Sequence, residues 1–349
     1  MESKSVLPDK LADGQTNLVP VKIPPRSFDP LKASDEDLVE YAYPRRPLEA
    51  NHEAFEIWRA IVSGPLPTEE SLYIVMGTTP DYQLSFNIPF SSGREETSQN
   101  WSGLVTHATD NSPFRSVFGL WQVPAVSAPV GTRNGDFRCS TWIGLDGTRR
   151  SLPSMPQIGT TQRVRVVRGV VKTEFEAWSQ WWALGGITRI QPFNGFPITA
   201  GDIVACSVDV VSPTSVNVSV TNITQGTHPY IRSMVPIIIT MPGTAPIVLN
   251  PAVTGTTAEW IAERPRQFAP PMDLFPLPVF DRVAFAAATV TPASGAQRGV
   301  GPVKVIRMVE PHAGPPARLH VLSRARKEYS ANGSAMVVAG PGLAHRMGG

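Results

Sequence analysis

Four short blocks in the middle of the chain carry polar side chains at positions where a buried strand needs none. They span residues 140–147 (STWIGLDG), 156–159 (PQIG), 177–182 (AWSQWW) and 258–263 (AEWIAE). A carboxylate can take a proton from water and pass it on, and a carboxamide can donate a hydrogen bond to developing negative charge. Together the blocks predict an active-site cleft laid across a sheet.

Each block is rich in β-favouring residues, so its side chains are expected to alternate between two faces of a strand. Three sets then share a face: Trp142 with Asp146; Glu176 with Trp178, Gln180 and Trp182; and Glu259 with Ile261 and Glu263. A face rich in tryptophan, carboxylate and carboxamide suits a groove that holds an extended polymer. The alternative is a half-buried antiparallel sheet whose polar face simply meets water.

The elements that must position these blocks are short strands. From residue 100 onward, β-favouring runs are separated by Gly, Pro, Asn and Ser. The clearest runs are 117–123, 163–171, 203–211, 216–220, 231–241, 282–290, 303–309, 319–322 and 335–338. Many short strands with no long helix between them predict an all-β sandwich or barrel.

Two short helices are predicted before this β-rich part. Ser34 is a candidate N-cap for a helix at 33–41, because acidic residues follow it in the first turn. Residues 51–62 show a second helical pattern, with one apolar stripe formed by Phe55, Trp58 and Ile61. These helices predict a packed element near the N-terminus.

The chain therefore divides into three expected parts. Residues 1–95 form an N-terminal extension that packs on or shields the main domain, and its first 30 residues are an extended arm. Residues 96–340 form the β-sandwich, and residues 341–349 form a C-terminal tail. The extension is either a propeptide that is removed or a permanent part of the folded protein, and both readings stay open here.

Composition argues against several classes of partner. A net charge of +2 with 17% charged residues gives no case for nucleic acid. The most apolar segment, 234–241, is far shorter than the ~20 residues of a membrane span, so we expect no membrane partner. The N-terminus lacks the apolar run of a secretory signal, which leaves the localisation open. We expect a monomer.

Metal and redox chemistry have no local signature either. The six histidines are scattered and never form a His-x-x-x-His pair, so we expect no metal and no cofactor. Cys139 and Cys206 are the only cysteines, and one disulfide between them is possible in an oxidising compartment.

Eight blocks follow one another in the order found in a known family. They are 100–103 (NWSG), 121–124 (WQVP), 140–147, 157–159, 177–181, 200–202 (AGD), 221–226 (TNITQG) and 258–263. In these blocks the chain resembles the glutamic peptidases, or eqolisins, over about residues 98 to 340. The resemblance implies a β-sandwich of two antiparallel sheets, of the concanavalin A-like lectin and glucanase type. It also implies an endopeptidase that acts at acid pH, is insensitive to pepstatin and has protein or peptide substrates.

The resemblance implies a catalytic glutamate at Glu263 and a catalytic glutamine at Gln157. Glu263 would activate water and then deliver the proton to the leaving amine, while Gln157 would stabilise the tetrahedral intermediate. Glu259 is the rival base, because it shares the strand and the face of Glu263. Four residues of strand separate the two carboxyls by roughly 13 Å, so they cannot act on one water as a close dyad.

The resemblance also implies supporting residues. Trp142 and Asp146 match positions that line the family's cleft, and Trp101 and Trp178 are similar candidates for substrate contact, although core packing would also explain a tryptophan. Gln180 stands where many relatives carry glutamate, which removes one ionisable group from the groove. Secreted acid-active members tend to be acidic, whereas this chain has a pI near 8.6, so we expect activity closer to neutral pH than is usual in the family.

Two other functions fit the same expected fold. A lectin-like binding module for carbohydrate or peptide would use a tryptophan-lined groove without catalysis. A glycoside hydrolase is less favoured, because a retaining pair of carboxyls stands ~5–5.5 Å apart, closer than Glu259 and Glu263 can come on one strand.

Overall fold

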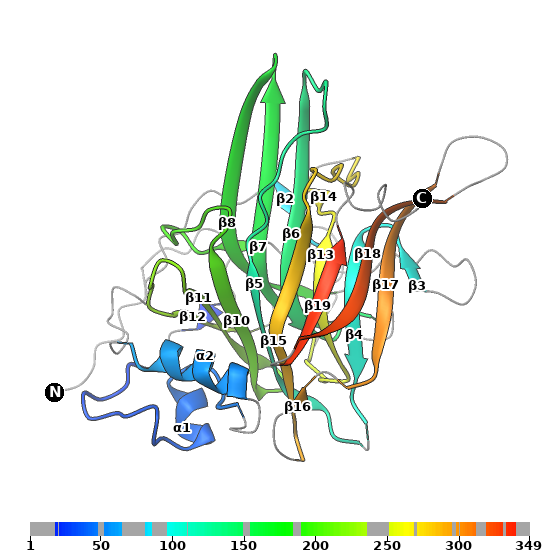
Figure 1. Cartoon of the computed structure of the whole chain (residues 1–349). Coiled ribbons are helices and arrows are strands. Elements are labelled where there is room, and N and C mark those ends of the chain that lie inside the picture. The colour runs from blue at the N-terminus through cyan, green and yellow to red at the C-terminus, as the bar shows by residue number, and fades with distance from the viewer. Residues whose placement is uncertain are drawn as a thin grey trace, which may run out of the picture.

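The computed structural model consists mainly of β-strands, which form two sheets packed as a sandwich (Figure 1). It describes residues 18–19, 21–47, 52–64, 81–85, 96–109, 111–148, 154–183, 190–235, 251–268, 271–294, 298–299, 301–311, 319–330 and 333–339. The all-β sandwich predicted from the sequence is therefore confirmed.

The first sheet, called here the site sheet, carries all four polar blocks. Its neighbouring strands are, in order, β9 (Gln191–Pro192), β8 (Val170–Ala183), β7 (Ser154–Val167), β6 (Gly135–Leu145), β13 (Thr257–Glu263), β4 (Trp101–His107) and β17 (Val303–Pro311). All these pairs are antiparallel. The short strand β3 (Glu96–Ser98) departs from the expected pattern, because it runs parallel to β17.

The second sheet, called here the back sheet, covers one face of the site sheet. Its strands are, in order, β1 (Leu18–Val19), β12 (Tyr230–Met234), β11 (Ser215–Asn222), β10 (Ile203–Ser212), β5 (Phe114–Gln122), β15 (Arg282–Pro292), β19 (Gly333–Ala339) and β18 (Leu319–Ser330), with β16 (Arg298–Gly299) beside β15. Strand β18 pairs with β17 at its start and with β19 along the rest of its length. One strand therefore joins the hydrogen bonding of both sheets.

The core lies between the two sheets. Ile143, Ile158 and Trp181 of the site sheet belong to the same buried cluster as Val208 and Phe285 of the back sheet. The alternate side chains of the site sheet point the other way, and they form a second cluster with Trp101, Trp142, Trp178 and Ile261. The site sheet is thus buried on both faces, which explains why its outer face is not a simple solvent-facing surface.

The two predicted helices are present and pack on the back sheet. They are α1 (Asp35–Glu40) and α2 (His52–Val62), and the Ser34 Oγ accepts the Asp37 N–H at 3.0 Å as the N-cap. Trp58 and Ile61 of α2 share a buried cluster with Phe118 and Ala287 of the back sheet. In Figure 1 both helices lie beside β10 to β12.

One strand expectation was wrong. The run 163–171 is not a single strand but the tip of a hairpin, because β7 ends at Val167 and β8 begins at Val170. Arg168 and Gly169 form the turn with φ of 52° and 83°. Two consecutive residues at positive φ match the two-residue turns that follow the twist of a hairpin. The strong β-propensity of the flanking valines hid this turn.

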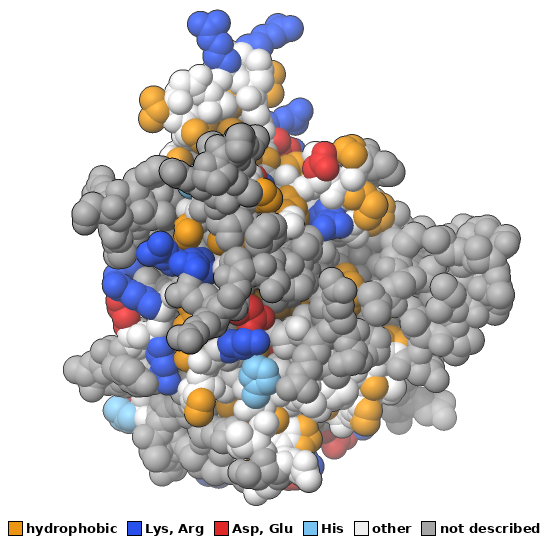
Figure 2. All heavy atoms as spheres, turned by 90° about the vertical axis from the view of Figure 1, so that its right-hand side faces the viewer, with side chains coloured by type: hydrophobic (Ala, Val, Ile, Leu, Met, Phe, Trp, Pro, Cys, Tyr) orange, Lys and Arg blue, Asp and Glu red, His pale blue; other side chains and the backbone are white. Residues whose placement is uncertain are grey.

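Figure 2 shows both basic and acidic side chains on the face of the molecule that it presents. Basic and acidic side chains pair on the edge formed by β3, β17 and β18, as in Lys304 with Glu96 and Arg326 with Glu328. Cys139 and Cys206 are buried free thiols, so the possible disulfide is not formed. Within the described ranges, no helix is long and apolar enough to cross a membrane.

Candidate active site

Three rows of residues cross the outer face of the site sheet, as the strand register defines them. The first row contains Gln180, Gln157, Gly144 and Glu259. The middle row contains Trp178, Gly159, Trp142, Ile261 and Gly103. The third row contains Glu176, Thr161, Ser140, Glu263 and Trp101. The rows place Gln157 level with Glu259 and not with Glu263, from which it is offset by four residues, or roughly 13 Å along the strands.

Glu263, at the end of β13, is fully buried and has several hydrogen-bond donors. The Trp142 Nε1–H donates to its Oε2 at 3.0 Å, and the Asn100 Nδ2 donates to its Oε1 at 3.3 Å. The backbone N–H of Ser85 donates to the same Oε1 at 2.9 Å. Burial raises the pKa of Glu263 to about 8, although these hydrogen bonds favour its ionised form and oppose the shift.

Glu259 lies on the same strand but in a different environment. Its carboxyl is also fully buried, and burial raises its pKa well above the usual range. Neither carboxyl oxygen accepts a hydrogen bond from a described residue, and the nearby Asp146 carboxyl adds to the rise. Glu259 is therefore held as a neutral acid, whereas Glu263 has the donors that a carboxylate needs.

Gln157, on β7, is fully buried in the first row. Its Nε2 donates to the Oε1 of Gln180 on β8 at 3.0 Å, while its Oε1 accepts no hydrogen bond from any residue that the structure describes. Gly144 separates it from Glu259 without a side chain between them, and a Cβ there would lie 3.2 Å from the Gln157 Cβ. The carboxamide thus has one N–H group engaged with Gln180 and a buried carbonyl oxygen without a partner among the described residues.

The tryptophans predicted to line the cleft meet around the middle row. Trp101 and Trp142 stack edge to face with ring centroids 5.0 Å apart, and the Trp178 Nε1–H donates to the Thr161 Oγ1 at 2.8 Å. Gly159 makes room for Trp142, because a Cβ at this position would lie 2.4 Å from the Trp142 Cβ. The structure therefore brings Trp101, Trp142 and Glu263 together, and separately Gln157 and Gln180.

Asp146 is placed differently from the cleft residues. Strand β6 ends at Leu145, and Asp146 follows with φ of 66°, so the alternation used in the sequence analysis does not extend to it. Its buried carboxylate accepts hydrogen bonds from the backbone N–H groups of Thr254 at 2.6 Å, Gly255 at 3.2 Å and Thr256 at 3.0 Å. Both threonine hydroxyls donate to it as well. This arrangement favours a role in holding the loop before β13.

Replacing Asp146 by Ala is expected to lower the free energy of unfolding by about 3–5 kcal/mol, because a buried carboxylate is lost and its backbone and hydroxyl donors lose their acceptor. Asparagine at position 146 keeps one acceptor oxygen and tolerates positive φ. Asp146→Asn should therefore lower the free energy of unfolding by about half as much as Asp146→Ala. Urea denaturation measures both, with the exposed Asp281→Ala as control, expected within ~0.5 kcal/mol of wild type. Unchanged stability with weakened substrate binding would instead support the predicted contact with substrate.

Several residues at the site were not singled out by the sequence. Asn100 lies in a block noted for the resemblance but binds Glu263 directly. Residues Asp81–Ser85, called here the cleft segment, cross the third row and bring Tyr82 and Ser85 to it. No local pattern could indicate this contact, because 178 residues separate Ser85 from Glu263.

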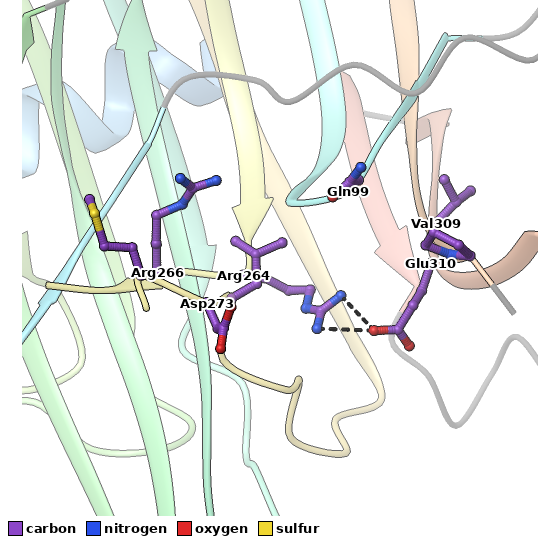
Figure 3. Close-up of a pocket in the computed structure, with 9 residues that line it drawn as sticks. Gln99, Arg264, Arg266, Asp273, Val309 and Glu310 are labelled. Atoms are coloured by element: carbon purple, nitrogen blue, oxygen red, sulfur yellow. Dashed lines mark hydrogen bonds and ion pairs between the residues drawn. The ribbon is translucent and has the colours of Figure 1, made fainter. Parts of the chain in front are cut away.

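A polar pocket of about 320 Å³ lies at the edge of the site sheet, next to the end of β13 (Figure 3). Arg264 points into it and binds Glu310 with both terminal nitrogens at 3.3 Å. Its lining includes neither Glu263 nor Gln157. In the part of the chain that the structure describes, no three His, Cys, Asp or Glu side chains are arranged to hold a metal ion.

A β-sandwich with buried carboxyls, a carboxamide and tryptophans in adjoining rows on one sheet has the architecture of a glutamic peptidase. Residues 99–314 match the sequence model of the peptidase A4 family, and the chain belongs to this family, that of the glutamic peptidases or eqolisins.

A solved structure of the family shares the fold. The structure of scytalido-glutamic peptidase with a transition state analog inhibitor aligns with a TM-score of 0.51 at 19% identity, covering 69% of this chain and 98% of that one. Aspergilloglutamic peptidase from Aspergillus niger aligns with a TM-score of 0.40 at 22% identity, covering 58% of this chain and 99% of that one. No curated protein matches the chain by sequence.

Proposed function

We propose that this chain is an endopeptidase in which Glu263 activates the attacking water and Gln157 stabilises the tetrahedral intermediate. The observation that carries the proposal is the contact between Glu263 and a backbone N–H, that of Ser85. It shows that a peptide chain fits against this carboxyl. Family membership supports the peptidase activity, and the three hydrogen-bond donors around Glu263 support its role over that of Glu259.

The proposed mechanism places the scissile carbonyl over Trp142. Trp142 lies in the middle row, halfway between the first row, which holds Gln157, and the third row, which holds Glu263. Strand side chains lean along the strand direction, so both side chains would lean toward this position. Glu263 would take a proton from water and pass it to the leaving amine. The Gln157 N–H would turn from Gln180 to the oxyanion.

Cleavage of an unfolded protein substrate across about pH 2 to 8, with pepstatin present, tests the proposed function. We expect the substrate to be cleaved at a rate that pepstatin does not reduce. No cleavage at any pH, even when residues 1–95 have been removed, would overturn the proposal in favour of the lectin-like binding module.

The same series predicts a pH profile that reaches toward neutral. A general base acts only when deprotonated, so below its pKa the rate falls about tenfold per pH unit. Burial raises the pKa of Glu263 to about 8, which means that ionised Glu263 becomes more abundant as the pH rises toward that value. We expect faster cleavage near pH 6 to 7 than near pH 3. Both pH values carry an uncertainty of about one pH unit. Activity confined to strongly acid conditions would contradict this assignment of the base.

A further inference from the structure

The cleft segment lies on the outer face of the site sheet and is held at both ends. At its start, the Arg138 guanidinium binds the Asp81 carboxylate through two nitrogens, at 2.5 and 3.0 Å. Strand β2 (Tyr82–Gln83) pairs with β14 (Arg266–Gln267) as a separate two-stranded sheet. Leu84 is fully buried in the same apolar cluster as Trp101 and Trp142. The segment is thus an extended peptide that is bound by side chains and by backbone.

The backbone of Ser85 is recognised through both of its polar groups. Its N–H donates to Glu263, while its carbonyl oxygen accepts the Trp101 Nε1–H at 3.1 Å and the Asn100 Nδ2 at 3.4 Å. These contacts do not depend on the side chain at this position. Any extended peptide could make them, which is what an endopeptidase cleft requires of its substrates.

Tyr82 is recognised through its side chain, which is 4% exposed. Its hydroxyl contacts the Thr161 Oγ1 at 2.9 Å and makes a short hydrogen bond with Glu176, both in the third row. The Arg138 guanidinium lies 5.3 Å from the Tyr82 ring centroid and 3.9 Å from that of Phe275. Thr161, Glu176, Arg138 and Phe275 define what we call the Tyr82 pocket.

We propose that the Tyr82 pocket, which the cleft segment fills in this structure, is a subsite for a tyrosine side chain of peptide substrates. This proposal rests on the proposed function. A matching substrate has a tyrosine three residues before the residue whose N–H faces Glu263, and an acidic residue before that tyrosine, as in the sequence Asp-Tyr-Gln-Leu-Ser. While the segment is bound, it excludes substrate from Glu263.

Simple packing would not produce this combination of contacts. Apolar coverage of the outer face needs only Leu84 and the tyrosine ring. The structure adds polar recognition at three points: Asp81 with Arg138, the Tyr82 hydroxyl with Thr161 and Glu176, and both backbone groups of Ser85. The contacts of Tyr82 and Ser85 are buried or partly buried, and polar groups in such contacts discriminate strongly against ligands that lack the matching group.

The test uses the full chain with Tyr82→Ala, and Gln83→Ala as the matched control. Gln83 lies in the same segment but makes no contact in the Tyr82 pocket that the structure describes. Losing a buried aromatic side chain shifts the segment toward an open state. We expect Tyr82→Ala to speed cleavage of an added peptide about tenfold or more and to raise amide hydrogen exchange across residues 81–85. Gln83→Ala should change each by less than about twofold.

A free peptide then tests the subsite directly. Acetyl-Asp-Tyr-Gln-Leu-Ser-amide is titrated into the Tyr82→Ala chain and followed by tryptophan fluorescence, since Trp101 and Trp142 lie at the cleft. The same peptide with Ala in place of Tyr should bind about tenfold more weakly or worse. Should Tyr82→Ala misfold, Tyr82→Phe keeps the ring and removes only the hydroxyl contacts, and a smaller rise in exchange and activity is expected.

The outcomes separate the two proposals. Peptide binding and raised exchange without cleavage by any variant would support the subsite and overturn the peptidase assignment. Cleavage by wild type, with no effect of Tyr82→Ala on rate or exchange and equal binding of both peptides, would overturn the subsite and leave the peptidase assignment standing.

Discussion

Glu263→Gln is expected to reduce peptide cleavage by about 10³- to 10⁴-fold, because a carboxamide cannot take the proton from water or return it to the leaving amine. The substitution keeps the length and shape of the side chain. The fold should persist, with a loss of no more than ~2 kcal/mol from the changed hydrogen bonds to Ser85, Asn100 and Trp142. Single-turnover cleavage measures the rate, and near-ultraviolet circular dichroism checks the fold.

Glu259→Gln is the matched control, because it makes the same change on the same strand in a carboxyl that is equally buried. It should leave the rate within about threefold of wild type, since burial already holds Glu259 neutral. The reverse result, with cleavage lost in Glu259→Gln and kept in Glu263→Gln, would assign the base to the residue that lies level with Gln157. The two variants distinguish the two carboxyls, because Glu259 lies in the same row as Gln157 and Glu263 lies two rows away.

Gln157→Ala is expected to lower the turnover number by about 10²- to 10³-fold, the usual loss when one donor to an oxyanion is removed. The effect should fall on kcat more than on KM, because the donor is needed most when charge develops on the carbonyl oxygen. Steady-state kinetics with a peptide substrate separates the two parameters.

Gln162→Ala provides the control for this second prediction. Gln162 is a buried glutamine on the same strand, but it faces the sandwich interior, where its Nε2 donates to the Thr160 Oγ1 at 2.7 Å. Its loss should reduce stability and leave the kinetics of the folded protein near wild type. Equal kinetic losses in both variants would mean that Gln157 acts only through packing.

The sequence predicted the fold well where alternation and turn residues agree. The strand at 216–220 and the helix capped by Ser34 were both found in this way. The turn at Arg168 was missed because valines on either side favour a strand, and only the pairing of β7 with β8 shows that the chain reverses there.

The site was predictable as a set of residues but not as an arrangement. Register between strands decides which side chains lie level, and no local pattern states that Gln157 and Glu259 both pair with Gly144. The position of the cleft segment could not be predicted for a similar reason, because Tyr82 and Ser85 contact third-row residues that are distant in sequence. Asp146 shows the converse case, in which a strand ends one residue before the pattern suggests.

The extension touches both sides of the sandwich, since α1 and α2 pack on the back sheet while the cleft segment lies on the site sheet. A single cut between Ser63 and Asp81 would therefore not release the helices. Trp58, Ile61 and Leu38 remain buried against Phe118 and Ala287, and each buried side chain of this size contributes about 1.5–3 kcal/mol. The product of such a cut is a two-chain molecule, in which a small helical subunit stays bound noncovalently behind the sheet that carries the cleft.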